Sequence, residues 1–440
     1  MSPPRQPNGG VAGFAADTAL LVATRVAAMI AAVALTVLLA ARLGLVGFGE
    51  YAFVSAVVFV GNVVTTFGTD MVLIRDIAGR GRLDRCAAAF ALQLALSAVV
   101  IAAVWLATAV LPAGHSDVSA ALRIMSLSLL PSALFSVCTA ALRGHGALRS
   151  YAAITVGAAA VPLLAIAVLV RPGADLVRAV TLLVLAQCVV GAVAWALCAV
   201  RVPDARIVSR TSPSDVVAMA RGSASIGVLG LLGVAYQRLG ALAVAVVAGP
   251  AATGWFAGAS RVVEASKTGH VALFTAVYPA MAMAEAQAQP GGASNRAALG
   301  WSWRLSLVSG GLVSAALLLA GPWLIDRLYG PAFAPSRAGL AILALAVVPS
   351  TVATYQSLAL LAADRARTTL RVLAGSLAIL LAATALLVPT VGWIGACWAT
   401  LIADSTSATL MLAARFGLRS NAVHHRAALP HTTALRGRYG

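Results

Sequence analysis

Apolar runs long enough to cross a bilayer recur along this 440-residue chain, and they restrict its fold more than any other feature. Hydrophobic residues make up 61% of the sequence and charged residues only 10%. A helix needs about 20 mostly apolar residues to cross the hydrocarbon core, where its backbone groups must be satisfied internally. The sequence therefore predicts an all-α, multi-pass membrane protein. The predicted spans cover residues 18–41, 50–73, 87–111, 119–142, 151–170, 176–200, 216–247, 253–285, 302–325, 338–362, 369–388 and 392–414, twelve in all.

The turn between the first two predicted spans, residues 41–51, occurs again in weaker form at residues 249–257. Both copies join two long apolar runs into a hairpin, so the repeat indicates that the chain is duplicated. The matching positions are Gly44 with Gly249, Gly49 with Gly254, Tyr51 with Phe256 and Ala52 with Ala257.

A second pair of segments repeats in the same order. Pro131 in the fourth predicted span is followed by a serine and precedes Arg149, and Pro349 in the tenth precedes Arg367 at the same interval. Six spans in each half would enter the membrane with the same orientation, which makes the repeat parallel, with its axis along the membrane normal. Such an arrangement places a substrate site between two lobes.

The Pro- and Ser-containing segment 201–215 is the longest candidate linker, and it divides the chain into halves of similar length. The predicted organisation is a cytoplasmic tail at 1–16, a first six-helix lobe at 17–200, the linker at 201–215, a second six-helix lobe at 216–415 and a basic tail at 416–440.

The formal net charge of +17 would suggest a nucleic-acid partner for a soluble chain. In a membrane protein, arginine-rich cytoplasmic loops explain such a charge, because they fix the orientation of the spans. Arginines concentrate in alternate connections, at 75–85, 201–210, 365–371 and in the last tail. We therefore predict that both termini are cytoplasmic. The five cysteines show no paired spacing, so no disulfide framework is predicted.

Several short motifs follow the pattern of a known family. The motifs are Ala-Arg-Leu-Gly at 41–44, Gly-Glu-Tyr-Ala at 49–52, Phe-Gly at 67–68, Leu-Ile-Arg-Asp at 73–76, and the stretches 254–264, 328–333 and 392–396. They resemble those of the polysaccharide flippases, the Wzx-type members of the multidrug/oligosaccharidyl-lipid/polysaccharide exporter superfamily. The resemblance covers nearly the whole chain.

This resemblance implies a two-lobed flippase in the bacterial inner membrane. Its substrate would be a polyprenyl-pyrophosphate-linked oligosaccharide, and its partners would be membrane lipids and the polysaccharide polymerase and glycosyltransferases of the same pathway. One position departs from the pattern. The family often carries an acidic residue in the seventh span after Tyr-x-Arg-Leu, where this chain has Gly240. A coupling role for an acid at that position is therefore not available.

Ionisable side chains inside spans are energetically expensive and prompt a functional question. Arg25 and Asp70 lie at similar depth on the two sides of the first turn, when each residue is counted as 1.5 Å of helix. Arg25 is a candidate substrate ligand and Asp70 a candidate gating residue. Snorkelling of Arg25 to the inner headgroups and pairing of Asp70 with a neighbouring arginine are equally open explanations.

The eighth predicted span carries Arg261, Glu264 and Lys267 at every third residue, so they keep to one half of the helix. His270 continues the series, and Arg238 in the seventh span lies at similar depth. An internal Arg–Glu structural pair would explain these charges. The alternative is a water-filled cavity that receives an anionic head group, because a guanidinium group donates to phosphate in a fork.

Under the second explanation, Arg238, Arg261 and Lys267 bind substrate and Glu264 acts in gating. Asp404 in the last predicted span either titrates in coupling, pairs with these charges or makes an interhelical hydrogen bond.

The absence of known motifs limits which energy sources could drive transport. Lys267 is the only lysine of the chain, so the phosphate-binding motif G-x-x-x-x-G-K-[ST] cannot be present. The sequence also lacks H-E-x-x-H and G-x-S-x-G. We therefore predict no enzymatic activity, no cofactor and no metal, and a secondary transport mechanism.

Together these observations predict a flippase that moves a lipid-linked oligosaccharide by alternating access around a basic central cavity. The alternative is a multidrug or metabolite antiporter of the same superfamily, which would favour acidic groups in the cavity. A membrane-embedded polymerase or ligase would usually carry a large outer loop, and the predicted outer loops are too short for one.

Overall fold

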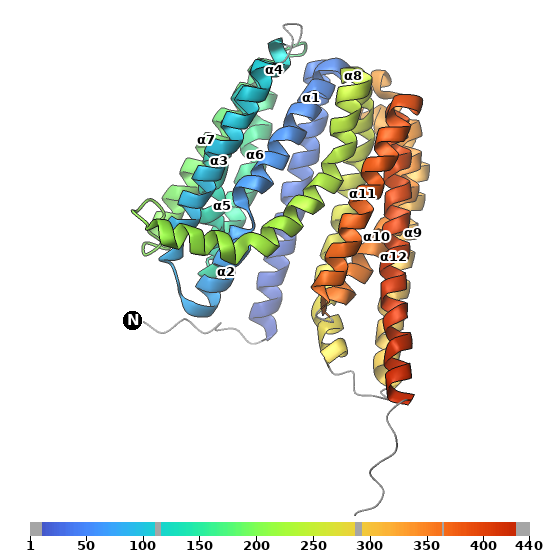
Figure 1. Ribbon diagram of the computed structural model, residues 1–440. Helices are drawn as coiled ribbons and strands as arrows, with labels where there is room; N and C mark the ends of the chain where they lie inside the picture. The colour runs from blue at the N-terminus through green and yellow to red at the C-terminus, as the bar shows by residue number, and fades with distance from the viewer. Residues whose placement is uncertain (1–10, 111–115, 287–292, 363–364, 428–440) are drawn as a thin grey trace, which may run out of the picture.

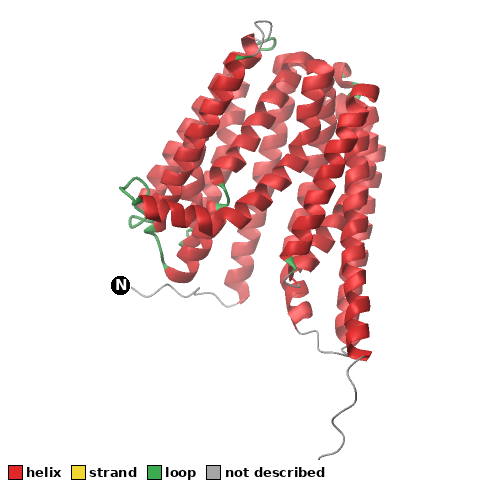
Figure 2. Cartoon of the chain, in the orientation of Figure 1, coloured by secondary structure: helices red, strands yellow, loops and turns green. Residues whose placement is uncertain are grey.

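The computed structural model describes residues 11–110, 116–286, 293–362 and 365–427. In these ranges the chain is helical with short connections, and no strand is present there (Figures 1 and 2). The helices are α1 Val11–Thr66, α2 Thr69–Arg80, α3 Arg85–Ala109, α4 Ser116–Ser126, α5 Leu129–Gly144, α6 Leu148–Leu169, α7 Leu176–Arg201, α8 Pro213–Ala286, α9 Ala293–Tyr329, α10 Ser336–Ala362, α11 Ala366–Val391 and α12 Trp393–Ala427, with a 3-10 turn, η2, at Pro331–Phe333.

Nine helical stretches of the described chain are long and apolar enough to cross a membrane. Two of them, Ala19–Arg80 with 62 residues and Pro213–Lys267 with 55, far exceed the roughly 20 residues that a bilayer requires. The first holds two predicted spans, the second holds one and the beginning of the next, and α12 is not among the nine. The fold is thus an all-α polytopic membrane protein, while the number of twelve spans stays a prediction.

A glycine with positive φ folds each long helix back on itself. Gly44 in α1 has φ 71° and ψ −176°, and Gly249 in α8 has φ 82° and ψ 179°. Only glycine adopts this backbone conformation readily, because it has no Cβ. The two copies of the turn found in the sequence therefore also share one backbone conformation.

The two turns pack against each other through their backbones. A Cβ added to Gly49 would lie 1.8 Å from the carbonyl oxygen of Pro250, and one added to Gly254 would lie 2.6 Å from that of Leu45. These contacts are reciprocal, because Gly49 matches Gly254 and Leu45 matches Pro250 in the repeat. They give the two halves of the chain a shared contact with approximate two-fold symmetry.

Two predicted spans are broken within the structure. The second, predicted at 50–73, ends as α1 at Thr66, and α2 starts after Phe67 and Gly68, which both have positive φ. Here α8 approaches closely, and a Cβ on Gly68 would lie only 2.9 Å from the backbone nitrogen of Gly227. The fourth, predicted at 119–142, is divided into α4 and α5 before Pro131, whose ring disfavours a helix through the preceding turn.

Figure 1 shows two groups of helices side by side. We call α1–α7 the first bundle, and α9–α12 with the part of α8 after Gly249 the second bundle. The first part of α8 begins against the first bundle, where Met219 is buried in the hydrophobic core, and rises to the turn. The predicted lobe boundaries at 200 and 215 stay a prediction.

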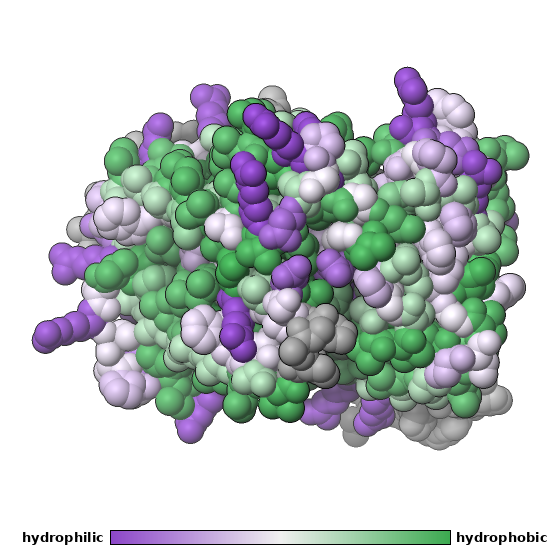
Figure 3. Space-filling view, turned by 90° about the horizontal axis from the view of Figure 1, so that it is seen from above, coloured by the Kyte–Doolittle hydropathy of each residue, from purple (hydrophilic) through white to green (hydrophobic). Residues whose placement is uncertain are grey.

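The outer surface is apolar where the helices face away from each other. Leu106, Val246 and Leu319 are 72%, 77% and 84% exposed. Large apolar side chains in such positions suit contact with lipid rather than with water. Seen from above, the end that carries the turns shows separate hydrophilic side chains on a largely hydrophobic background (Figure 3).

Candidate functional site

The reversal of α8 at Gly249 brings charged residues from its two parts together. Glu264 Oε1 accepts a hydrogen bond from Arg238 Nη1 at 3.1 Å, and Glu264 Oε2 accepts one from Arg261 Nη1, also at 3.1 Å. Each carboxylate oxygen is therefore bound to a different arginine. We call Arg238 and Arg261 the arginine pair, and Glu264 is the carboxylate that they share.

Arg238 also contacts the first bundle. Its guanidinium carbon lies 4.6 Å from the centre of the Phe59 ring of α1, a distance typical of a cation–π interaction. The Arg238 side chain is 11% exposed, and its Nε is buried without a hydrogen-bond partner among the described residues. A buried donor of this kind can bind a further acceptor without losing an existing contact.

A cavity of about 160 Å³ lies between the first part of α1, the second part of α8 and the end of α9. The α1 side is mainly apolar, whereas Arg261 and Glu264 contribute charge from α8. The lining residues are Met29, Ala32, Val33, Thr36, Arg261, Val262, Glu264, Ala265, Leu328 and Tyr329. We call this space the interbundle cavity.

Lys267 and Asp404 form a second charged contact, between α8 and α12. Lys267 Nζ lies 3.6 Å from Asp404 Oδ2 and donates to Ser350 Oγ at 2.9 Å. The Tyr236 hydroxyl donates to Asp404 Oδ1 at 2.7 Å. Asp404 is only 5% exposed, so its carboxylate depends on these two partners for charge balance and hydrogen bonding.

The structure brings five of the seven candidate residues into these two clusters and leaves two outside them. Arg25 is exposed on α1 and has no ion-pair partner in the described part of the chain. Asp70 lines a separate cavity of about 320 Å³ within the first bundle. The side chain of His270 lies outside the described residues.

Sequence reasoning missed Asp76, which is 1% exposed at the end of the first bundle. Its carboxylate lies 3.7 Å from Arg75 Nε, 3.6 Å from Arg80 Nη1 and 2.5 Å from Arg85 Nη1. The i,i+4 spacing to Arg80 was the available sequence signal. Because Arg85 opens α3, the cluster fixes the connection between α2 and α3.

Gly240 occupies a tightly packed position. A Cβ there would lie 2.9 Å from Cζ of the Phe256 ring. Any side chain at this position would require the Phe256 ring to shift.

Comparisons of the fold agree with this architecture. An inward-facing multidrug resistance MATE transporter of the MOP superfamily superimposes with a TM-score of 0.72 at 12% identity, covering 94% of this chain and all of the other. The lipid II flippase MurJ in an inward closed conformation gives 0.67 at 10% identity, with 92% and 87% covered. A MOP superfamily transporter from Pyrococcus furiosus, described by the reverse polarity of its binding pocket, gives 0.66 at 13% identity, with 92% and 96% covered.

The chain therefore has the fold of the transporters and flippases of the MOP superfamily. A family model described as polysaccharide biosynthesis protein matches residues 14–285, and the chain belongs to this family. A search of curated protein sequences gave no match.

Proposed function

We propose that the protein is a flippase that moves a polyprenyl-pyrophosphate-linked oligosaccharide across the bacterial inner membrane for surface polysaccharide synthesis. Its family and its MOP-type fold support a transport role in polysaccharide biosynthesis. The lipid and the substrate class come from the resemblance, and the charged residues provide guanidinium groups that suit a phosphate. Membrane lipids and the polymerase and glycosyltransferases of the same pathway are the proposed partners.

The observation that carries this proposal is that two arginines share one carboxylate beside the interbundle cavity. Arg238 and Arg261 bring two positive charges, and Glu264 brings one negative charge. A pyrophosphate that enters the cavity can take the place of Glu264 at both guanidinium groups, because each offers further N–H donors in a fork. Glu264 would then act in gating, because it holds the arginines together only when substrate is absent.

The other candidate residues have supporting roles in the proposal. Lys267 adds positive charge next to Glu264 on α8, and Arg25 attracts the anionic head group from the exposed first part of α1. Asp404 and Asp70 are proposed to act in gating or coupling when the charges around them change. These roles rest on position and charge.

Alternating access would rock the two bundles about the contact between the turns at Gly44 and Gly249. In the predicted orientation this contact lies at the outer face, and both termini lie in the cytoplasm. The arrangement would then be open toward the cytoplasm, and the likeness to an inward-facing MATE transporter supports this view of the conformation.

The charge beside the interbundle cavity favours the proposed flippase over a multidrug antiporter. A transporter of cations would favour acidic groups in its cavity. Arg261 and Glu264 line this one, and Arg238 beside them brings the sum of the three to one positive charge. The P. furiosus transporter, with its reverse polarity of the binding pocket, is a case within the same fold where polarity was taken to suggest a different function.

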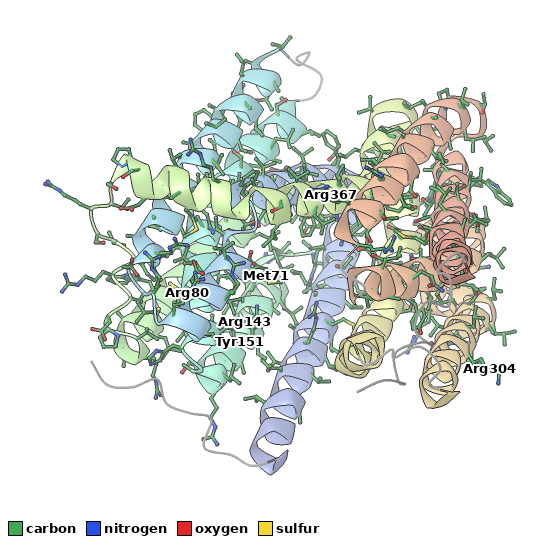
Figure 4. All side chains as sticks on the ribbon, turned by 60° about the horizontal axis from the view of Figure 1, so that its bottom comes forward. Met71, Arg80, Arg143, Tyr151, Arg304 and Arg367 are labelled. Carbon is green, nitrogen blue, oxygen red and sulfur yellow. The ribbon has the colours of Figure 1, made fainter. Side chains whose placement is uncertain are left out.

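Leaflet translocation of a fluorescent polyprenyl-pyrophosphate oligosaccharide in reconstituted vesicles tests the proposal. We expect the double variant Arg238→Gln, Arg261→Gln to reduce the rate at least tenfold. Arg304→Gln is the matched control, because Arg304 is exposed on α9 and lies at the edge of the molecule in Figure 4. Equal rates in protein-free vesicles and in vesicles with the wild-type protein would refute the function. An unchanged rate in the double variant would refute the site.

A further inference from the structure

The larger cavity, of about 320 Å³, lies within the first bundle, and Asp70 is the one lining residue that the mechanism above uses. It is bounded by the second part of α1, α2, α5 and α7. Most of its lining residues are polar or charged. The lining residues are Asn62, Thr66, Asp70, Ile74, Ser132, Phe135, Ser136, Thr139, Ala140, Arg143 and Gln187. We call it the first-bundle cavity.

Two polar side chains in this cavity lack a partner within the described part of the chain. Neither the Asn62 amide nor the Asp70 carboxylate makes a hydrogen bond or ion pair with any residue that the structure describes. Gln187 Nε2 donates to Ser132 Oγ at 3.3 Å, which leaves further capacity on both groups. In a membrane protein, unpaired polar groups inside a bundle are costly, and they mark sites where a polar ligand or water binds.

Arg143 provides a cationic donor at one end of the cavity. Its guanidinium carbon lies 5.2 Å from the centre of the Tyr151 ring, which holds it in place. Figure 4 shows Arg143 and Tyr151 next to each other on the side of the first bundle that this view brings forward. Phe135 adds an aromatic ring to the lining.

The repeat places an equivalent cluster in the second bundle. Asn62 lies as far after Gly44 in the sequence as Lys267 lies after Gly249. The second match is between the serines that directly follow Pro131 and Pro349. The third is between one residue of α7 and one of α12 that lie equally far from the start of their helix. The matched residues are Asn62 with Lys267, Ser132 with Ser350, and Gln187 with Asp404.

The two clusters differ in charge. In the second bundle the three positions form the contact of Lys267 with Asp404 and Ser350. In the first bundle all three are neutral, and they border an open cavity. Lys267 balances the charge of Asp404, although Asp404 Oδ2 makes no hydrogen bond with the described residues. The first-bundle positions carry no charge to balance, and they offer hydrogen-bonding groups to the cavity.

We propose that the first-bundle cavity is a glycan subsite, which binds one or two neutral sugar residues of the lipid-linked substrate. This inference rests on the function proposed above. Sugar hydroxyls both donate and accept hydrogen bonds, which suits a lining of amides and hydroxyls with one carboxylate and one guanidinium group. The C–H face of a sugar ring packs against Phe135.

The two sites lie on neighbouring parts of one helix. Phe59 of α1 holds the Arg238 guanidinium on one side, and Asn62, less than one turn later, lines the first-bundle cavity. In the proposal, the sugar joined to a pyrophosphate at the arginine pair reaches this cavity.

The size of the cavity argues against a bare cation as its occupant. Its volume of about 320 Å³ is at the lower end of small-molecule pockets, roughly 300–1,000 Å³. One water takes up only about 30 Å³ in the liquid, and an ion held by Asp70 would leave most of the space to water. The subsite is thus matched to an organic ligand.

Binding of two kinds of lipid to the purified full-length protein in nanodiscs tests the subsite. One probe is a short-chain polyprenyl pyrophosphate, and the others are the same lipid bearing one glucose, galactose or N-acetylglucosamine residue. We expect the wild type to bind at least one sugar-bearing lipid about tenfold tighter than the bare lipid. Asn62→Leu and Gln187→Leu should each reduce that advantage by about three- to tenfold.

The affinity for the bare lipid serves as the folding control, because these variants should leave it unchanged. Gln237→Leu is the matched substitution outside the cavity, since Gln237 is exposed on α8, and it should retain the full advantage for the sugar. Equal affinity of the wild type for bare lipid and every sugar-bearing lipid would overturn the subsite and leave the proposed flippase function standing.

Two other results would also be decisive. Failure of the wild type to bind any of these lipids would overturn the proposed function, and with it the subsite. If Asp70→Asn abolishes a sodium dependence of lipid binding and keeps the sugar advantage, the cavity is a cation site and the glycan proposal is wrong.

Discussion

Removing the positive charge of Lys267 should destabilise the protein because of the carboxylate left behind. In Lys267→Met, Asp404 keeps the Tyr236 hydroxyl but loses its counter-charge, and it is only 5% exposed. Loss of one partner of a buried ion pair costs about 3–5 kcal/mol. Because the Lys267 side chain is 33% exposed, we expect about 3 kcal/mol, the lower end of that range.

The second half of the cycle removes the stranded charge. We expect Lys267→Met, Asp404→Leu to lie within about 1 kcal/mol of the wild type, because replacing both partners leaves no unpaired ion. The coupling energy of the double-mutant cycle would then be about 2 kcal/mol or more. Reversible unfolding in mixed detergent micelles, followed by circular dichroism, measures each free energy.

The contact between Arg337 and Asp326 is the matched control, because both side chains are more than 40% exposed. Arg337→Gln should cost less than about 1 kcal/mol, as is usual for an exposed pair. If Lys267→Met costs no more than Arg337→Gln, or if the two substitutions in the cycle simply add, then burial of Asp404 does not govern this contact and the reasoning is refuted.

Three further substitutions test the fold. Gly49→Ala places a Cβ against the Pro250 backbone and should cost at least about 3 kcal/mol or prevent recovery of monodisperse protein, whereas Gly79→Ala, where a Cβ would meet nothing, should be neutral; equal unfolding free energies would contradict the packing of the turns. Asp76→Asn should cost about 2–3 kcal/mol in the same unfolding assay, because three arginines lose a shared partner. Asp84→Asn, at an exposed pair, should change the unfolding free energy little. A reversed order would argue against the role given to Asp76. Gly240→Asp should be destabilised by the Phe256 ring and partly rescued by Phe256→Ala, so a stable single variant would show that the ring moves aside.

The fold was predictable because its signals are local in sequence. Each apolar run is contiguous, and the repeated turn at Gly44 and Gly249 has matching residues at fixed spacing. The break after Thr66 was not predictable, because it depends on the approach of Gly227, far away in the sequence. Pro131 was visible in the sequence, but an apolar run on both sides of it does not reveal that the helix is interrupted.

The site was predictable only in part. The spacing of Arg261, Glu264 and Lys267 indicates that they share one half of α8, but which acid neutralises which base depends on how the helices are rotated. Hence the sequence left open whether Asp404 contacts Lys267, and it treated Asp76 as part of a loop. The equivalence of Asn62 with Lys267 becomes informative only when the cavity beside Asn62 is seen.

The contact between the two turns brings Gly49 against the carbonyl of Pro250 and Gly254 against that of Leu45, and none of these four residues lines either cavity. Substitutions at the cavities therefore leave the joint between the bundles unaltered, and changes in the joint need not alter what the cavities bind. This separation allows specificity to evolve independently of the mechanical movement. A family with this joint could adapt to many different glycans by substituting residues such as Asn62 or Gln187, while one pair of glycines preserved the way its halves meet.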